Sequence, residues 1–168
     1  SLGAYVNEHV LRSVLEDPEA AGIHGASRRV TVLMADIVGY SSFAEARSAE
    51  EVVGVLNGYF EAMTEAIQKE GGTVDKFIGD GLLAIFGAPL ALPRDGAPHA
   101  VKAALEMERQ LERLQADWRL SGLPALDIGI GVHTGTSVVG NMGSRRKMEY
   151  TVIGDAVNVA ARIESRSR

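Results

Sequence analysis

The sequence predicts an α+β fold in which two long helices cover one face of an antiparallel sheet. Apolar side chains recur at helical spacing over 48–70 and 96–120, whereas the runs between them are short and strand-like. A chain of 168 residues with 46% apolar and 23% charged residues has an ordinary globular composition, which excludes disordered and fibrous classes. We therefore expect a single main domain with one proper core.

The first 27 residues are expected to form a short amphipathic helix followed by a linker. Apolar residues recur at helical spacing from Tyr5 to Leu15, and the pattern ends at Asp17-Pro18. An isolated helix of this length is marginal in water, so it either packs on another element or continues from an upstream region. We accordingly divide the chain into this segment, 1–27, and a domain at 28–168.

Local signals predict the first strand and the first long helix. Arg28–Ala35 is a β-branched and apolar run that stops at Asp36, which is typical of a central strand. Ser48 and Glu51 have the spacing of a capping box, in which each side chain bonds the backbone of the other residue. The helix predicted over 48–70 therefore begins at this box.

The remaining elements complete a recognised order of strands and helices. They are a hairpin of strands at 73–78 and 82–86 joined by Gly79-Asp80-Gly81, a helix at 96–120, a strand at 126–132, a hairpin at 136–153 that turns within 140–147, and a final helix beginning near Gly154. This βαββαβ order is that of the ferredoxin-like sandwich, here with an added hairpin and a C-terminal helix.

The composition also excludes several classes of function. Without cysteine, the chain has no disulfide, no thiolate zinc site and no cysteine nucleophile. A net charge of −5 argues against a nucleic-acid partner. No apolar run approaches the roughly 18 residues of a membrane span. The 4 histidines show no metal-binding spacing, and neither a Walker A nor a GxGxxG pattern is present.

Two aspartates are candidate ligands for a divalent metal. Asp36 ends the first strand and Asp80 lies in the turn of the following hairpin, so both reach the same edge of the sheet if their strands are neighbours. Magnesium is usually bound by one or two carboxylates together with substrate phosphates. The alternative is that Asp36 caps a loop and Asp80 only forms the turn.

Lys76 is a candidate ligand-binding cation. Strand alternation places it on one face with Val74 and Ile78, and places Asp75 and Phe77 on the other face. A cation among apolar neighbours is costly unless it has a partner or a ligand. The alternative is a strand lysine that points to water.

Asn158 and Arg162 are candidates on the last helix. They are four residues apart and therefore share a face, and asparagine is a poor choice inside a helix unless it has a hydrogen-bonding task. Arg162 is also compatible with an ordinary surface position. Arg146, at the tip of the predicted hairpin, would by itself be interpreted as a solvated residue.

Three stretches resemble the class III adenylyl and guanylyl cyclase catalytic domain, which implies its palm-like sandwich fold. They are TVLMADIVGYSSF (31–43), GGTVDKFIGDGLLAIFGAP (71–89) and IGIGVHTGTSVVGNMGSRRKMEYTVIGDAVNVAARIE (128–164), in family order. The opening segment also resembles the short helix that links such domains to an upstream regulatory region. We therefore expect a regulatory domain before this chain.

The resemblance implies a two-metal site and a set of phosphate contacts. The family's two aspartates, which hold two Mg²⁺ or Mn²⁺ ions, fall on Asp36 and Asp80, and a backbone carbonyl ligand falls on Ile37. The implied phosphate contacts fall on Gly39, Tyr40, Ser41 and Arg146.

The resemblance also implies how the nucleotide base is selected. Lys76 falls on the position at which a lysine accepts adenine and at which guanylyl cyclases tend to have glutamate. Thr151 falls on its partner position, where many adenylyl cyclases have aspartate and many guanylyl cyclases have cysteine. Asn158 and Arg162 fall on the residues that steady the ribose and the transition state.

The implied activity is that of an adenylate cyclase, which converts ATP into 3′,5′-cyclic AMP and pyrophosphate. The family arrangement is a head-to-tail homodimer with its sites at the interface, where one subunit supplies the two aspartates and the other supplies the base-binding and transition-state residues. The alternatives are a guanylate cyclase and a catalytically silent, cyclase-like regulatory or dimerisation domain. A diguanylate cyclase is more distant, because the GG(D/E)EF run is absent.

Two further expectations concern the longer protein. The family continues through another hairpin, so we expect the C-terminal part of the domain to be missing after residue 168. We expect the catalytic domain to be cytoplasmic, with the full-length protein either free or attached to a membrane.

Overall fold

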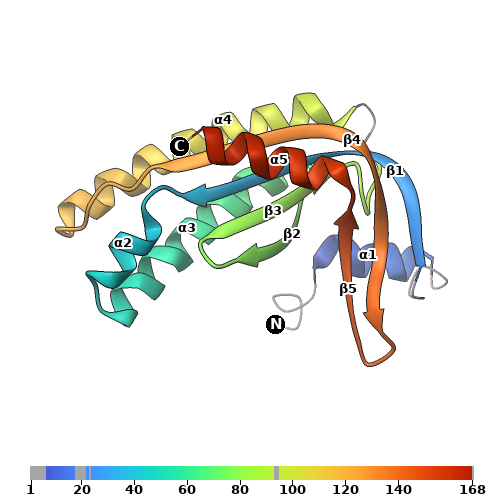
Figure 1. Cartoon of the computed structure of the whole chain (residues 1–168), viewed down its shortest axis with the longest axis horizontal. Coiled ribbons are helices and arrows are strands. Elements are labelled where there is room, and N and C mark those ends of the chain that lie inside the picture. Colours follow the sequence, from blue (N-terminus) through green and yellow to red (C-terminus); the bar gives the residue numbers. More distant parts are fainter. Residues whose placement is uncertain (1–6, 18–21, 23, 93–94, 168) are drawn as a thin grey trace.

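The computed structural model describes residues 7–17, 22, 24–92 and 95–167 and contains one five-stranded antiparallel sheet of order β2-β3-β1-β4-β5 (Figure 1). The strands are β1 (His24–Ile37), β2 (Thr73–Ile78), β3 (Gly81–Phe86), β4 (Ile128–Ser144) and β5 (Lys147–Ile153). Strands β1 to β4 have the order of the ferredoxin-like sandwich, and β5 extends it beside β4. The predicted fold class is confirmed.

Five helices lie among the described residues. They are α1 (Glu8–Glu16), α2 (Tyr40–Glu45), α3 (Ala49–Lys69), α4 (Gly96–Leu120) and α5 (Asp155–Arg166). The predicted capping box opens α3, because Ser48 Oγ accepts from the Glu51 amide at 3.2 Å and Glu51 Oε2 accepts from the Ser48 amide at 3.1 Å. The six-residue helix α2 was not expected from the sequence.

The two faces of the sheet bury two separate apolar clusters. On one face, α3 and α4 pack against inward residues of β1 and β3, among them Leu33 and Phe86. On the other face, α5 packs through Ala156 and Ala160 against Val32 and its neighbours. Figure 1 shows α5 lying along β4, away from α3. The terminal helix therefore adds a third layer to the two-layer sandwich.

A glycine lets α5 lie directly on the sheet. A Cβ at Gly131 of β4 would overlap the Ala160 carbonyl oxygen and the Glu164 amide nitrogen of α5. The helix backbone thus approaches the strand at a distance that only glycine permits. This close approach fixes where α5 presents its outer face.

The long strands correct two expected boundaries. The strand expected at 126–132 and the first arm of the hairpin expected at 136–153 are one strand, β4, which turns at 145–146 into β5. Strand β1 begins at His24 rather than Arg28, so residues 24–27 pair with β4 instead of forming a linker. The two long strands pair with each other without interruption from His24 opposite Asn141 to Ile37 opposite Ile128.

Helix α1 docks on the edge strand β2. Asn7 caps the helix by accepting from the His9 amide at 3.0 Å, and its Nδ2 donates to the Val74 carbonyl at 2.7 Å. His9 Nδ1 lies 2.6 Å from Thr73 Oγ1. The helix spans 8–16 and packs on β2, which is one of the two alternatives expected for it. Residues 1–6, 18–21 and 23 of the predicted helix and linker lie outside the described residues.

Of the helices in the described part of the chain, none combines the length and the apolar character needed to cross a bilayer.

Candidate active site

The two predicted metal ligands lie together at one end of the sheet. Asp36 is near the end of β1, and Asp80 is in the turn from β2 to β3, the strand that pairs with β1. Asp80 Oδ2 accepts a hydrogen bond from the Ile37 amide at 3.1 Å. A Cβ on Gly81 would lie 3.6 Å from the Asp36 Cβ, so the turn rests against Asp36. Strand pairing therefore brings both carboxylates to one place.

The donor set at this end of the sheet fits magnesium or manganese. Asp36, Asp80 and the Ile37 carbonyl offer only oxygen ligands, which hard divalent cations prefer. Within the described ranges no cluster of three or more His, Asp or Glu side chains could enclose a metal. A site with two carboxylates leaves coordination positions for substrate phosphates, as magnesium sites usually do.

The pKa of the Tyr59 hydroxyl is influenced by burial and by the carboxylates of Asp36 and Asp80. Its side chain is fully buried in the core under the sheet. Burial first, and then the nearby carboxylates of Asp36 and Asp80, raise the pKa of the Tyr59 hydroxyl well above its usual value. The two carboxylates therefore lie close enough to act on a buried hydroxyl in the core beneath them.

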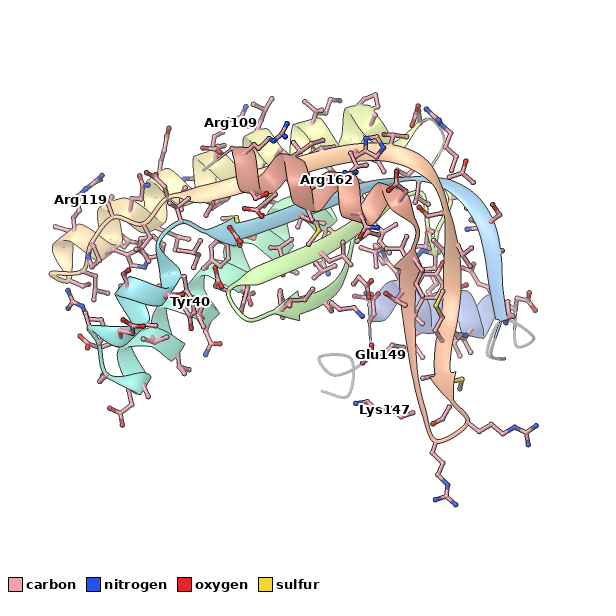
Figure 2. All side chains as sticks on the ribbon, in the orientation of Figure 1. Tyr40, Arg109, Arg119, Lys147, Glu149 and Arg162 are labelled. Carbon is pink, nitrogen blue, oxygen red and sulfur yellow. The ribbon has the colours of Figure 1, made fainter. Side chains whose placement is uncertain are left out.

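The predicted phosphate loop follows β1 directly. Gly39 has a φ of 69°, a left-handed conformation that favours glycine, and it precedes the first residue of α2, Tyr40. Ser41 is exposed on the first turn of α2. The loop is thus continuous in the chain with Asp36, and Figure 2 labels Tyr40 beside α2.

A bulge in β2 changes the predicted faces of that strand. The register with β3 shifts between Val74 and Lys76, so Asp75 is the extra residue. Beyond the bulge, the Phe77 ring stacks on Phe60 of α3 at 4.1 Å between centroids. The expectation that Val74, Lys76 and Ile78 share one face was wrong, because strict alternation does not pass through a bulge.

The bulge turns two polar side chains of β2 toward β5. Lys76 Nζ pairs with Glu149 Oε2 at 3.3 Å. Thr151 Oγ1 donates to Asp75 Oδ2 at 2.7 Å. Although β2 and β5 are the two outer strands of the sheet, the sheet curls enough for these side chains to meet. The structure thus brings the predicted base-selecting residues, Lys76 and Thr151, to one region.

The four side chains of Asp75, Lys76, Glu149 and Thr151 form the β2–β5 cluster. Two of its members, Asp75 and Glu149, were not predicted from the sequence. Asp75 was assigned to the opposite face from Lys76, and Glu149 was not singled out. Asp75 and Glu149 line a cavity of about 270 Å³ together with Lys76, Met148 and Tyr150, the α1 cap residue Asn7, and Val10 of α1. No local signal singled out Asp75, because its contact with Thr151 depends on the bulge and on a strand 76 residues further along the chain.

The candidates on α5 are exposed. Asn158 and Arg162 both lie on the outer side of the helix, and the Arg162 side chain is 70% exposed. Arg162 Nη2 approaches Asp155 Oδ1 at 3.9 Å, which leaves the guanidinium available to other groups. Asn158 and Asp155 line an open groove of about 390 Å³ with the end of β5.

Arg146 stands apart from the other candidates. It is exposed in the turn between β4 and β5, where its amide donates to Ser144 Oγ at 3.3 Å. Figure 2 shows this hairpin projecting from the body of the molecule, with Lys147 and Glu149 labelled along it. The described structure places no other predicted site residue at this tip.

Comparisons with known proteins identify the family of this chain. Residues 24–168 match the family model described as "Adenylate and Guanylate cyclase catalytic domain". The chain is 38% identical over 98% of its length to "Adenylate cyclase 1" of Rhizobium meliloti, and 41% identical over 83% of its length to "Adenylate cyclase" of Anabaena cylindrica. It spans 24% and 27% of the length of these two relatives.

Solved structures give the same family. The adenylyl cyclase CyaB from P. aeruginosa superposes with a TM-score of 0.83 at 36% identity, covering 87% of this chain and 76% of that one. The guanylyl cyclase Cya2 superposes with a TM-score of 0.83 at 42% identity, covering 87% of this chain and 74% of that one. From its sequence and its fold, the chain belongs to the adenylate and guanylate cyclase catalytic domain family.

Proposed function

We propose that this chain is the catalytic domain of an adenylate cyclase that converts ATP into 3′,5′-cyclic AMP and pyrophosphate. The observation that carries the proposal is the pairing of Asp36 and Asp80 at the end of β1, joined through the Ile37 amide. Relatives named adenylate cyclase at 38% and 41% identity support the same activity. In this reaction the ribose 3′-oxygen attacks the α-phosphorus in line, and pyrophosphate leaves.

Asp36, Asp80 and the Ile37 carbonyl would hold two Mg²⁺ or Mn²⁺ ions. Bound there, these ions supply a lowered pKa for the ribose 3′-hydroxyl and neutralisation of phosphate charge. The protein contributes by fixing both carboxylates, since the Asp80 turn is tied to the Ile37 amide and rests against Asp36. Gly39, Tyr40 and Ser41 would contact the phosphates beside them.

Lys76 and Thr151 would bind the adenine ring. The ammonium group of Lys76 donates to ring nitrogen N1, and the Thr151 oxygen accepts from the exocyclic amino group. Both side chains occupy the β2–β5 cluster, where Glu149 and Asp75 hold them. This arrangement favours adenine over guanine, because guanine presents a hydrogen at N1 and a carbonyl in place of the amino group.

Arg162, Asn158 and Arg146 would act on the sugar and the phosphates. An exposed guanidinium places fixed positive charge where the α-phosphate gains negative charge, which is worth most in the transition state. Asn158, one turn earlier on α5, would orient the ribose. Arg146, on the projecting hairpin, would reach the polyphosphate.

We further propose a head-to-tail homodimer in which each site is shared. One subunit would supply Asp36 and Asp80, and its partner would supply Lys76, Thr151 and the residues of α5. Within one chain the exposed outer face of α5 carries Asn158 and Arg162 toward solvent, which supports their use by a second copy. A monomer would then be inactive. Because the adenylate cyclases it resembles are several times longer, an upstream regulatory domain is part of this proposal.

Product formation from each nucleotide tests the proposal. The full-length protein is purified and incubated with ATP or GTP in Mg²⁺ or Mn²⁺, with and without a chelator. The expected result is metal-dependent cyclic AMP formation that far exceeds cyclic GMP formation. The similarity to the guanylyl cyclase Cya2 makes preferential use of GTP the specific alternative. Absence of both products would contradict the proposed enzyme and favour a catalytically silent, cyclase-like regulatory or dimerisation domain.

A further inference from the structure

The bulge in β2 places one carboxylate directly behind a base-selecting residue. Asp75 is the unpaired residue of that bulge, and its side chain reaches across to β5. It accepts there from the Thr151 hydroxyl at 2.7 Å and from the Val152 backbone amide. The carboxylate therefore links the two outer strands of the sheet at the point where the base is proposed to bind.

The direction of the bond to Asp75 fixes the polarity of Thr151. A hydroxyl has one hydrogen and two lone pairs, and an ionised carboxylate only accepts. The Thr151 hydrogen is therefore committed to Asp75, which leaves only lone pairs for a ligand. An oxygen in this state attracts the amino group of adenine and repels the carbonyl oxygen of guanine.

We propose that Asp75 is a positioning residue that selects ATP over GTP by holding the Thr151 hydroxyl as a pure hydrogen-bond acceptor. The inference rests on the proposed function and extends it to a residue that does not itself touch the substrate. Threonine alone does not discriminate between the bases, because a free hydroxyl rotates to accept from adenine or donate to guanine. Discrimination arises from the buried group behind it.

The substitution Asp75→Asn tests the role of Asp75 directly. It keeps the size and shape of the side chain but replaces an acceptor oxygen by an amide group that is able to donate to Thr151. An amide has a single acceptor oxygen. When that oxygen retains the Val152 amide, the nitrogen faces Thr151 and donates to it, so the Thr151 hydrogen is released toward the base. The expected result is a fall of about tenfold in the ratio of kcat/KM for ATP to that for GTP, caused by a rise for GTP as well as a loss for ATP.

Three variants control the experiment. Asp75→Ala removes the acceptor altogether and should also lower the ratio, which keeps the test valid if the amide distorts the bulge. In a Thr151→Val background, Asp75→Asn should leave the ratio unchanged, because the hydroxyl through which it acts is gone. Asp117→Asn, an exposed carboxylate-to-amide change on α4, should leave the wild-type ratio unchanged.

The outcome that overturns the proposal is a parallel loss for both nucleotides in Asp75→Asn, which would assign Asp75 a structural role only. Equilibrium binding of 3′-deoxy-ATP and 3′-deoxy-GTP provides a second readout that requires no turnover, since these analogues lack the attacking hydroxyl. A wild-type protein that forms no cyclic nucleotide would contradict the proposed function. It would still test the role of Asp75 through the shift in binding preference, and an unchanged preference would reject it.

Discussion

The carboxylate of Asp80 is held by the backbone amide of Ile37, with 3.1 Å between Oδ2 and the nitrogen. This hydrogen bond joins the β2–β3 turn to the end of β1, at the residue that follows Asp36. It places the carboxylates of Asp36 and Asp80 at the same end of the sheet. Because we propose that these two carboxylates hold the metal ions, substitutions at this end of the sheet should affect activity most strongly.

Asp36→Asn should abolish catalysis without unfolding the protein. It removes one charged ligand from the proposed metal pair, and we expect a loss of about 1,000-fold in kcat. The change is nearly isosteric, so the thermal midpoint should stay close to that of the wild type. A cyclic AMP assay with a Mn²⁺ titration, combined with thermal unfolding, measures both. Full activity in Asp36→Asn would contradict the proposal that Asp36 is a metal ligand.

Arg162→Ala should separate catalysis from stability. The side chain is 70% exposed and its ion pair with Asp155 spans 3.9 Å, so its loss should change the free energy of unfolding by less than about 0.5 kcal/mol. We expect kcat to fall about 100-fold with a small change in KM, since the charge acts mainly in the transition state. Arg119→Ala, an exposed arginine on α4, is the matched control. Equal losses in both variants would contradict the role of Arg162.

Gly131→Ala should displace α5. The added Cβ would overlap the Ala160 carbonyl oxygen and the Glu164 amide, so we expect a loss of about 3 kcal/mol in unfolding free energy. Gly54→Ala is the control, because nothing lies within 4 Å of its added Cβ on the exposed side of α3. Alanine there should stabilise by about 0.5–1 kcal/mol. Denaturant unfolding measures the free energy of unfolding of both variants. An unchanged free energy of unfolding in Gly131→Ala would contradict the close packing of α5 on β4.

The preference for ATP should depend on pH. Burial, the largest influence, raises the pKa of Asp75, whereas Thr151, Lys76 and the Val152 amide act in the opposite direction and Glu149 adds to the rise. Once protonated, Asp75 is able to donate, and the polarity of Thr151 is no longer fixed. The ratio of kcat/KM for ATP to that for GTP should fall as the pH drops through this raised pKa. In Asp75→Asn the ratio should be flat over the same range.

The same carboxyl group predicts a trend in stability. Its pKa is higher in the folded than in the unfolded state, so the folded state binds more protons between the two values. Wild-type stability therefore falls as pH rises through that interval, and the contribution is constant above it. Unfolding free energies of the wild type and Asp75→Asn, measured across acidic pH, should diverge as pH rises. A constant difference would show that the Asp75 pKa is not raised.

Features set by local sequence were predicted well. The capping box of Ser48 and Glu51 lies within one turn, and the structure contains it as expected. The meeting of Asp36 and Asp80 followed from strand adjacency, which the βαββαβ order implies. Both predictions needed only short-range signals and one general rule of topology.

Features set by pairing across the sheet were not predictable in the same way. The bulge at Asp75 exists only relative to the register of β3, which no local pattern encodes. The hairpin turn was expected within 140–147, yet Gly140 lies inside β4, where a Cβ would overlap the His24 carbonyl oxygen of β1. The contact between Thr151 and Asp75 depends on the curl of the whole sheet.

The shared site is tested most directly by mixing two inactive subunits. Asp36→Ala removes a metal ligand, and the double variant Asn158→Ala/Arg162→Ala removes the α5 residues, so each homodimer should be inactive. In a heterodimer both defects fall in one site and leave the other intact. Random pairing of equal amounts should therefore restore about a quarter of wild-type cyclic AMP formation. A co-expressed, doubly tagged heterodimer that remains as inactive as its parents would contradict the account.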